Sequence, residues 1–272
     1  MAAAFKIDQR GTKVATVEFR GIGKTFDAQE GAVRALDGID LKLEDGEFLS
    51  LIGPSGCGKS SLLEIAAGLS VPTEGQVLLD GEPQSGTSRD IGVVFQDSAL
   101  LGWRTIRRNV GLGLEIAKVG KAEIRERVQR AIELVGLRGF EERYPHQLSG
   151  GMRQRAGLAR TLVNDPRIIL MDEPFSAVDH LTRIGLQDEI VKIWRQQKKT
   201  ILFVTHDVSE AVYLADRVAL LSPRPGKIQA VFKIPSQRPR KRGDMSLIEI
   251  VEKIYLAINT AGQNSVEPEY VV

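Results

Sequence analysis

The chain has 272 residues, 42% of them hydrophobic, which is enough to bury the core of one large domain or of a domain with an inserted lobe. Its 37 basic and 35 acidic residues nearly cancel to a net charge of +2, so no overall field predicts a nucleic-acid partner. One cysteine excludes an intramolecular disulfide, and without a leader peptide or an apolar run of about 20 residues we expect a cytoplasmic chain.

The N-terminal part, through about Gly46, has the pattern of antiparallel strands. Its runs VEFRGIGKTF and VRALDGIDLKLEDGEF place apolar residues at every second position and are interrupted by Asp-Gly pairs. Alternation of this kind is typical of half-buried strands, and Asp-Gly favours the tight turns that join them. We therefore predict an antiparallel β subdomain.

Three later runs are apolar without interruption: FLSLIG (48–53), RIILMD (167–172) and TILFVT (200–205). Strands buried on both faces of a parallel sheet have this composition, because helices cover both sides. Each run is followed by a helical pattern, so the fold class that we predict for this part is α/β.

Between about residues 97 and 165 the pattern becomes helical. In AEIRERVQRAIELVGL the side chains of Ile124, Val128, Ile132 and Val135 repeat along one helical face, with charges opposite. We interpret this stretch as a helical subdomain inserted into the α/β core.

The chain closes with two more β-like runs, VALLS and KIQAVFKI, and then a basic linker, QRPRKRGD. A last helix carries Leu247, Ile250, Val251 and Ile254 at helical spacing. We therefore expect one domain over residues 1–235, with the helical insertion inside it, and a linker and helix over residues 236–272.

A glycine-rich loop follows the first buried run. Its spacing fits G-x-x-x-x-G-K-[ST] between a predicted strand and a predicted helix. Glycines let backbone N–H groups turn toward phosphates, and the helix N-terminus favours negative charge. We expect a nucleoside triphosphate here, with Lys59 at the β- and γ-phosphates and Ser60 on Mg²⁺. The expected binding positions are Gly53, Pro54, Ser55, Gly56, Cys57, Gly58, Lys59, Ser60 and Ser61.

Two alternatives remain for this loop. It could be an ordinary glycine turn, although strand, loop and helix follow in the required order. Cys57 could suggest redox chemistry, but thiol reactivity needs a lowered pKa, so we interpret this residue as a small filler.

Polar groups also follow the other buried runs. Asp172 and Glu173 are adjacent and point to opposite sides, so Asp172 is placed to hold Mg²⁺ and Glu173 to accept a proton from water. His206 could donate to a phosphate oxygen or to the attacking water. Gln96 could ligate Mg²⁺ or orient the water, since an amide cannot act as a base. The alternative is that these acids simply begin a solvated loop and that the histidine is structural.

The stretch LSGGMRQR (148–155) offers a second anion site. Ser149 can cap the helix that follows, and Gly150 and Gly151 expose N–H groups. One nucleotide does not need two such loops. We therefore expect this one to serve a nucleotide held by a second copy of the chain.

These motifs together resemble the ATP-binding cassette family, the nucleotide-binding subunits of ABC transporters. Six of them appear in the family's order, from GPSGCGKSS through Gln96, LSGGMRQR and IILMDE to SAVD and His206. The resemblance assigns the Mg²⁺ ligands to Ser60, Gln96 and Asp172, and implies that Asp179 belongs to the D-loop. It further implies that Phe26 stacks on adenine, although an aromatic residue here could equally lie in a core.

A narrower resemblance is to the cassette subunits of nitrate, sulfonate and taurine importers, carried by SGCGKSSLL, VFQDSALLGWRTIRRNV and RPRKR. The sequence departs from that pattern at Gly102, where proline is familiar, and at Val178, where leucine is usual. Gly102 affects the loop before Trp103 that would meet a partner.

The resemblance implies an ATP-dependent, head-to-tail homodimer. Each ATP would lie between the phosphate loop of one copy and residues 149–151 of the other. The dimer would act on transmembrane permease subunits, and through them on a substrate-binding protein, from the cytoplasmic face of the plasma membrane. The coupling groove would lie near residues 96–108, although that stretch could also be a solvated basic helix.

Other functions remain open at this point. A soluble cassette machine of DNA repair or translation would need a long coiled coil or a second cassette, and the sequence has neither. A P-loop kinase for a small molecule would leave LSGGMRQR and His206 unexplained. A non-catalytic interaction subunit would not need Glu173.

Overall fold

The computed structural model describes residues 15–28, 31–176 and 178–263. The chain divides into two compact units, one formed by Met1–Thr87 with Thr200–Val272 and the other by Ser88–Lys199. The helical stretch predicted at about 97–165 falls within the second unit, which also includes strands on either side of it.

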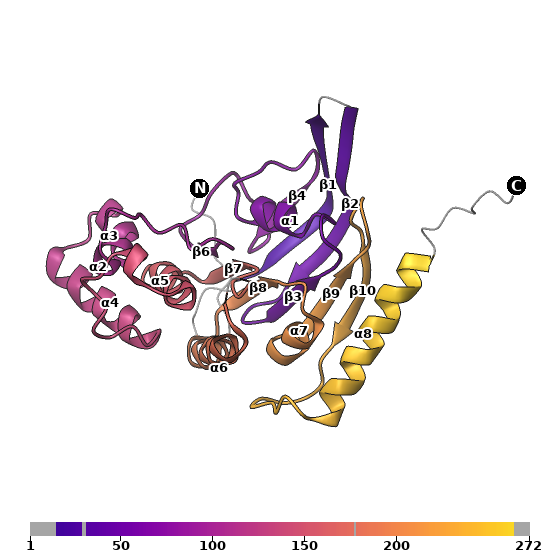
Figure 1. The fold of residues 1–272 in the computed structure, drawn as a ribbon. Coiled ribbons are helices and arrows are strands. Elements are labelled where there is room, and N and C mark those ends of the chain that lie inside the picture. The colour runs from indigo at the N-terminus through magenta and orange to yellow at the C-terminus, as the bar shows by residue number, and fades with distance from the viewer. Residues whose placement is uncertain (1–14, 29–30, 177, 264–272) are drawn as a thin grey trace, which may run out of the picture. The chain divides into compact units, whose positions relative to one another are not determined.

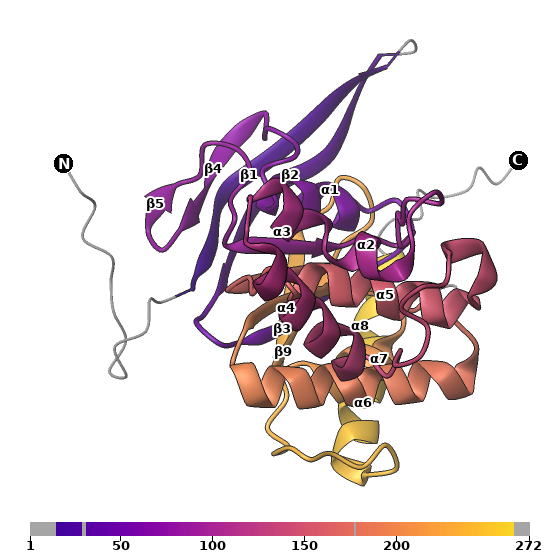
Figure 2. The same cartoon turned by 90° about the vertical axis from the view of Figure 1, so that its left-hand side faces the viewer.

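The first unit contains an antiparallel sheet of four strands in the order β2-β1-β4-β5, of which Figure 1 labels β1, β2 and β4 and Figure 2 labels all four. Its strands are β1 (Val17–Ala28), β2 (Gly31–Leu43), β4 (Glu74–Leu79) and β5 (Glu82–Pro83). β1 and β2 form a long hairpin in which Val17 lies opposite Leu43. The antiparallel subdomain predicted from the alternating pattern is therefore confirmed.

Four further strands of the first unit lie side by side in the order β10-β9-β3-β8. Their bounds are β3 (Phe48–Ile52), β8 (Thr200–Val204), β9 (Arg217–Leu221) and β10 (Ile228–Lys233), and the helices of this unit are α1 (Lys59–Ala66), α7 (Val208–Leu214) and α8 (Met245–Gln263). β3 is parallel to both β8 and β9, and β10 returns antiparallel to β9. All residues of β3 and β8 are buried, as their unbroken apolar composition predicts.

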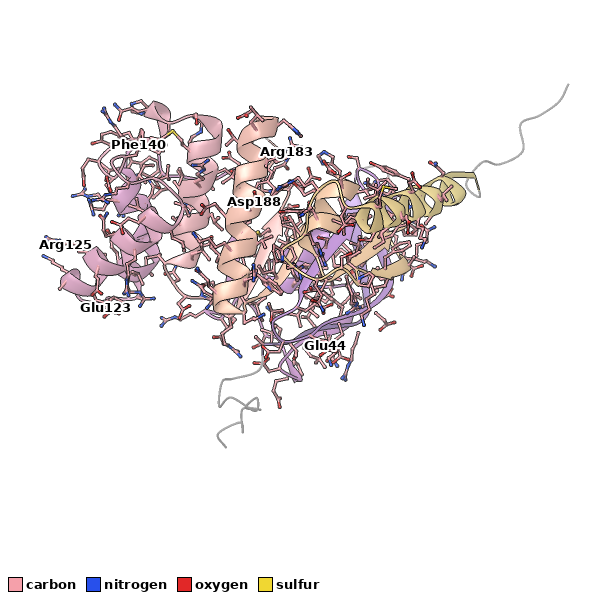
Figure 3. All side chains as sticks on the ribbon, turned by 90° about the horizontal axis from the view of Figure 1, so that it is seen from below. Glu44, Glu123, Arg125, Phe140, Arg183 and Asp188 are labelled. Carbon is pink, nitrogen blue, oxygen red and sulfur yellow. The ribbon has the colours of Figure 1, made fainter. Side chains whose placement is uncertain are left out.

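The second unit contains two parallel strands and a group of helices, and Figure 2 shows the helices. Its elements are β6 (Ile91–Val94), α2 (Ile106–Val110), α3 (Leu112–Ile116), α4 (Lys121–Leu134), the 3-10 turn η1 (Pro145–Gln147), α5 (Gly150–Leu162), β7 (Ile168–Asp172) and α6 (His180–Gln197). On α4, Val128 and Ile132 are fully buried, whereas Glu123 and Arg125 lie on the charged face (Figure 3). The predicted amphipathic helix is confirmed.

The basic stretch before α8 differs from a solvated linker. Arg240 is buried, and the side chain of Arg238 is only 9% exposed. Both guanidinium groups hydrogen-bond to main-chain carbonyls at the end of α7. Composition indicated the charge of this stretch correctly but not its burial. Across the described ranges, no helix combines the length and the apolar character needed to cross a bilayer.

Candidate active site

The loop after β3 depends on glycine. Gly58 precedes α1 with a φ of 101°, in the left-handed region. A Cβ atom on Gly58 would lie 2.6 Å from a side-chain carbon of Leu36 and 3.0 Å from the carbonyl oxygen of Ala35. Any larger residue would push the loop away from β2. Packing and backbone conformation thus both require the second glycine of the motif.

Lys59 is held inside this loop. Its side chain is nearly buried, and its Nζ donates 2.9 Å hydrogen bonds to the carbonyl oxygens of Gly53 and Pro54. No acidic residue occupies the first turn of α1. An ammonium group beside a helix N-terminus without a neighbouring carboxylate suits an anion such as phosphate.

Cys57 fills space beneath the loop. It is 1% exposed, and a Cβ on Gly53 would approach its Sγ to 2.9 Å. Burial raises the pKa of the Cys57 thiol, and the nearby Lys59 offsets this only in part. A thiol that resists ionisation is a poor nucleophile, which agrees with the interpretation as a filler.

The loop between β9 and β10 supports the phosphate loop from outside. Arg224 donates two hydrogen bonds, of 3.2 and 3.1 Å, to the carbonyl oxygen of Gly56. A Cβ on Gly226 would lie 2.1 Å from the carbonyl oxygen of Cys57, so the two backbones are in close contact. Sequence reasoning missed Arg224, because nothing local marks a partner 168 residues away.

His206 emerges beside the phosphate loop. Leu51 of β3 pairs with Val204 of β8, so the two parallel strands end at the same edge of the sheet. The exposed His206 follows Thr205, whose buried hydroxyl donates a 2.5 Å hydrogen bond to Glu210 of α7. Register and hydrogen bonding thus bring the predicted histidine to the edge where Gly53 begins its loop.

Phe26 lies near the tip of the β1–β2 hairpin. Its side chain is 42% exposed, and the Nζ of Lys24 lies 5.0 Å from the ring centroid. The core alternative for this residue is therefore not supported. An exposed ring remains available for stacking.

The remaining predicted residues belong to the second unit. Val94 of β6 pairs with Met171 of β7, and Gln96 and Glu173 each follow two residues later. Gln96 and Glu173 therefore both follow the carboxyl ends of these neighbouring parallel strands. Gln96 is exposed, while Asp172 and Glu173 are half-buried.

Glu173 has an unusual backbone conformation. Its φ is 41°, a left-handed value that non-glycine residues rarely adopt, and its carbonyl oxygen accepts a 3.1 Å hydrogen bond from the amide of Ser176. Such strain is concentrated at functional positions, since the surrounding fold must enforce it. The sharp turn re-aims the chain immediately after β7.

The second glycine-rich stretch begins α5. The hydroxyl of Ser149 accepts a hydrogen bond from the amide of Met152, as a helix cap does. A Cβ on Gly151 would lie 2.8 Å from a methyl carbon of Thr182 on α6. Asp179 caps α6 by accepting from the amide of Thr182, and hydrogen bonds from the side chain and then the amide of Thr182 lower the pKa of its carboxyl group. Gly151 and Asp179 therefore both lie beside Thr182.

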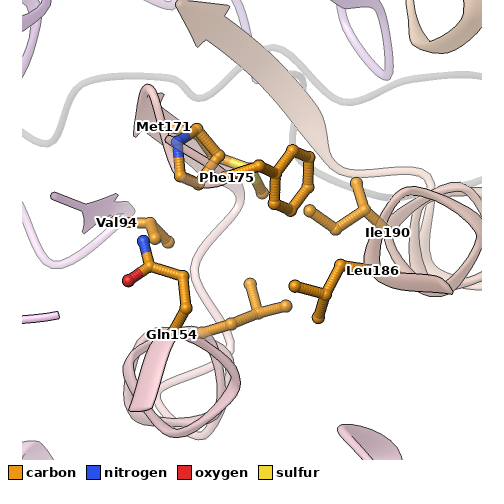
Figure 4. Close-up of a pocket in the computed structure, with 8 residues that line it drawn as sticks. Val94, Gln154, Met171, Phe175, Leu186 and Ile190 are labelled. Atoms are coloured by element: carbon orange, nitrogen blue, oxygen red, sulfur yellow. The ribbon is translucent and has the colours of Figure 1, made fainter. Parts of the chain in front are cut away.

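α5 is also fastened to the segment that carries Gln96. Gln154 donates to the carbonyl oxygen of Phe95 at 3.2 Å, and Arg160 donates to those of Ser98 and Ala99 at 2.7 Å. Burial lowers the pKa of Arg160. Beside Gln154 is a cavity of about 10 Å³ (Figure 4), lined by Val94, Gln154, Leu158, Met171, Pro174, Phe175, Leu186 and Ile190. It has room for about one water molecule, so it is a packing gap and not a ligand site.

The donor chemistry of the predicted metal ligands fits Mg²⁺. A hydroxyl, an amide oxygen and a carboxylate are the hard oxygen donors that this ion prefers. In the part of the chain that is described, no group of three or more His, Cys, Asp or Glu side chains could enclose a metal ion. Mg²⁺ in nucleotide sites is usually held by one or two carboxylates together with substrate phosphates and waters, and Asp172 is the one carboxylate of the predicted set.

Comparison with known proteins identifies the family. A family model described as "ABC transporter" matches residues 36–176. An uncharacterized ABC transporter ATP-binding protein of Methanocaldococcus jannaschii is 50% identical over 249 residues, covering 92% of this chain and 93% of the relative. The chain belongs to the ABC transporter ATP-binding family. The aliphatic sulfonates import ATP-binding protein SsuB of Bacillus cereus is 42% identical to this cassette over 239 residues, covering 88% of the cassette and 94% of that protein.

Solved structures agree with this assignment. A dimeric post-hydrolysis structure of an ATP-binding cassette bound to ADP and Pi matches with a TM-score of 0.74 at 34% identity, covering 81% of this chain and 100% of that one. The structure of cbiO1 from Clostridium perfringens, with a TM-score of 0.73 over 92% of this chain and 98% of that one, is 23% identical and shows the shared fold. The cassette is an ATPase with the P-loop fold predicted from its sequence.

Proposed function

We propose that this cassette powers an importer, and that its cargo is an aliphatic sulfonate or a chemically similar small anion such as taurine or nitrate. The observation that carries this proposal is the identity of 41–42%, over 88–91% of the chain, to relatives named as aliphatic sulfonate import subunits. The cassette has no assigned contact with the cargo. Its contribution to import is the free energy of ATP binding and hydrolysis.

ATP binding depends on the phosphate loop. The N–H groups of residues 55–61 surround the phosphates, and Lys59 neutralises the β- and γ-phosphates. The helix dipole of α1 adds favourable potential at the same point. Phe26 stacks on the adenine ring, in keeping with its exposed position. The two loop carbonyls that now hold Lys59 keep its ammonium group within reach of an incoming phosphate.

Hydrolysis uses the polar groups that follow the buried strands. Glu173 accepts a proton from water as that water attacks the γ-phosphorus in line, and Gln96 orients the water. His206 donates a hydrogen bond to the γ-phosphate, where negative charge must be stabilised in the transition state. When Mg²⁺ is bound, it neutralises charge on the β- and γ-phosphates. Ser60, Gln96 and Asp172 are the residues that would hold it.

Two copies of the cassette work together. Residues 149–151 of one copy present a helix N-terminus to the γ-phosphate held by the other, so ATP stabilises a head-to-tail dimer. Asp179, which lies beside Gly151 through Thr182, belongs to the same face. Because ATP contacts both copies, it binds the closed dimer more tightly than the open one, and hydrolysis reopens the pair.

The dimer transmits this motion to transmembrane permease subunits at the cytoplasmic side of the membrane. We assign the contact to the loop around Trp103, which is 77% exposed. The loop is ordered by Asn109, a fully buried residue whose amide accepts from the N–H of Leu101 and donates to the carbonyls of Leu101, Arg104 and Thr105. An exposed indole on an ordered loop is a typical anchor for a protein partner.

Growth of the source organism tests the proposal. A strain that lacks this gene is complemented with the wild-type or the Lys59→Ala protein and grown on an alkanesulfonate or taurine as sole sulfur source, and on nitrate as sole nitrogen source. Loss of growth on one source, restored by the wild type alone, supports ATP-driven uptake and names the cargo. Equal growth of the three strains on every source contradicts the importer assignment.

A further inference from the structure

The basic stretch before α8 has no role in the nucleotide site described above, yet one of its arginines is among the most buried charged groups of the first unit. Arg240 is 8% exposed. Burial lowers the pKa of Arg240 to about 10, so the guanidinium is still charged and keeps all its N–H donors at neutral pH. A buried charge of this kind is costly unless it is fully hydrogen-bonded.

The partners of Arg240 are carbonyl oxygens at the end of α7. Its Nη1 donates to Val212 and Tyr213 at 3.0 Å and to Ala215 at 2.7 Å, and its Nε donates to Ser236 at 3.0 Å. The last carbonyls of a helix lack partners within the helix and carry partial negative charge. Arg240 therefore fixes the C-terminal end of α7 to the segment that leads into α8.

The other end of α7 directly follows His206. Asp207 caps the helix by accepting a 3.0 Å hydrogen bond from the amide of Glu210. Glu210 also accepts from the hydroxyl of Thr205, and the amide of Asp207 donates to that same hydroxyl at 3.1 Å. The residues on both sides of His206 are thus tied to the first turn of α7.

α7 has only seven residues, a length of about 10 Å. A rigid helix this short cannot shift at one end without shifting at the other. β8 is hydrogen-bonded to β3, the strand that leads into the phosphate loop. Any movement of His206 relative to that loop therefore depends mainly on the Thr205–Asp207 turn and on α7.

We propose that Arg240 is a positioning residue for ATP hydrolysis: by clamping the C-terminal end of α7, it holds His206 where it meets the γ-phosphate. This proposal rests on the role given to His206 under the proposed function. The acceptors of Arg240 lie at the end of α7 and at Ser236, and none of them is assigned to the nucleotide. Its effect reaches the reaction only through α7 and His206.

A double-mutant cycle tests the proposal. ATP hydrolysis is measured in single turnovers, with protein in excess, and in steady state to obtain kcat and KM. We expect Arg240→Met to lower kcat about tenfold and to leave KM for ATP within twofold, since small displacements of a catalytic group cost rate and not binding. The matched control is Lys241→Met, which removes an exposed neighbouring charge and should change neither constant.

The decisive comparison is the effect of Arg240→Met on kcat in the wild-type protein and in the His206→Ala variant. If Arg240 acts through His206, Arg240→Met lowers the residual rate less than twofold further in that background. A tenfold loss in both backgrounds, or a normal kcat for Arg240→Met, overturns the proposal. If Arg240→Met does not fold, Arg240→Lys answers the same comparison, because it keeps the charge but replaces the planar guanidinium, with five N–H donors on three nitrogens, by three donors on one nitrogen.

The same experiment separates this proposal from the assignment on which it rests. A normal kcat for His206→Ala alone refutes the role of His206, and the clamp proposal with it. A low kcat for His206→Ala together with additive Arg240 effects refutes the clamp alone.

Discussion

The side-chain amide of Gln154 donates a 3.2 Å hydrogen bond to the main-chain carbonyl oxygen of Phe95. Gln154 lies on α5, the helix that begins at Gly150, and Phe95 directly precedes Gln96. The helix expected to meet the partner's nucleotide is thus bonded to the segment that carries Gln96, the glutamine proposed to orient water. Within the second unit, a shift of α5 therefore also shifts the segment that carries Gln96.

Loss of this hydrogen bond has a measurable effect. Gln154→Leu keeps the side-chain volume but leaves the Phe95 carbonyl without its donor. We expect the free energy of unfolding to fall by about 1 kcal/mol and kcat for ATP to fall several-fold, with KM unchanged because Lys59 is untouched. Urea melts and steady-state kinetics measure both quantities. Gln197→Leu, at the exposed end of α6, is the matched control. An equal fall in the free energy of unfolding and in kcat in that variant would contradict the proposed link between α5 and the Gln96 segment.

Glu173 is expected to separate binding from hydrolysis. Glu173→Gln keeps the shape of the side chain and loses the base, so kcat falls by about 10²–10⁴ while ATP is still bound. Lys59→Ala, in contrast, loses binding as well. Titration with a fluorescent ATP analogue and a phosphate-release assay distinguish the two. Turnover near the wild-type rate in Glu173→Gln would refute the general-base assignment.

The left-handed backbone at Glu173 allows a further comparison. Glycine accepts a φ of 41° without the steric cost borne by glutamate, so Glu173→Gly should be at least as stable as the wild type and still fail to hydrolyse ATP. Thermal melting beside the phosphate-release assay tests this. A drop in melting temperature of several degrees would show that the glutamate side chain, and not the backbone, is what the fold needs there.

Local patterns in the sequence predicted the features that depend on residues close together along the chain. The unbroken apolar composition of residues 48–52 and 200–204 predicted buried strands, and the phosphate-loop spacing predicted the turn into α1. Arg224 and Arg240 were not predicted as structural residues, because their partners are set by tertiary folding across 168 and up to 28 residues. A basic stretch has the same composition whether its arginines are solvated or bury their guanidinium groups against carbonyls.

Arg224 should affect nucleotide affinity more than chemistry. Without its two hydrogen bonds to Gly56, the phosphate loop loses support on its outer side, so Arg224→Ala is expected to raise KM for ATP several-fold and to leave kcat within twofold. Steady-state kinetics over a range of ATP concentrations measure the split. Lys233→Ala removes an exposed charge from β10 and serves as the control. A fall in kcat at constant KM would give Arg224 a different role.

The raised pKa of Cys57 predicts how the rate of alkylation of its thiol depends on pH. Because burial raises its pKa, the thiolate is scarcer than in a free thiol at the same pH, and reaction with iodoacetamide should be slow at pH 8 and rise with a midpoint above the ordinary value of 9.0. The folded chain holds the Cys57 proton more tightly than the unfolded chain does. The free energy of unfolding therefore falls as pH rises through the raised pKa. The chain has no other cysteine, so mass spectrometry reads this site alone. A midpoint below that of the chain unfolded in urea would contradict the shift.

Trp103 separates hydrolysis from transport. Its indole is 77% exposed on a loop fixed by the buried Asn109, and Trp103 is not among the residues assigned to the nucleotide. We expect Trp103→Ala to keep the ATPase rate of the purified cassette within twofold and to abolish growth on the cargo in the complemented strain, because truncation of an aromatic anchor can cost 2 kcal/mol or more of binding, about 30-fold in affinity. Ile116→Ala, which truncates an equally exposed side chain on α3, should support growth. If Trp103→Ala also supports normal growth, the permease must contact another surface, and the buried amide of Asn109 would then order this loop for a reason other than coupling.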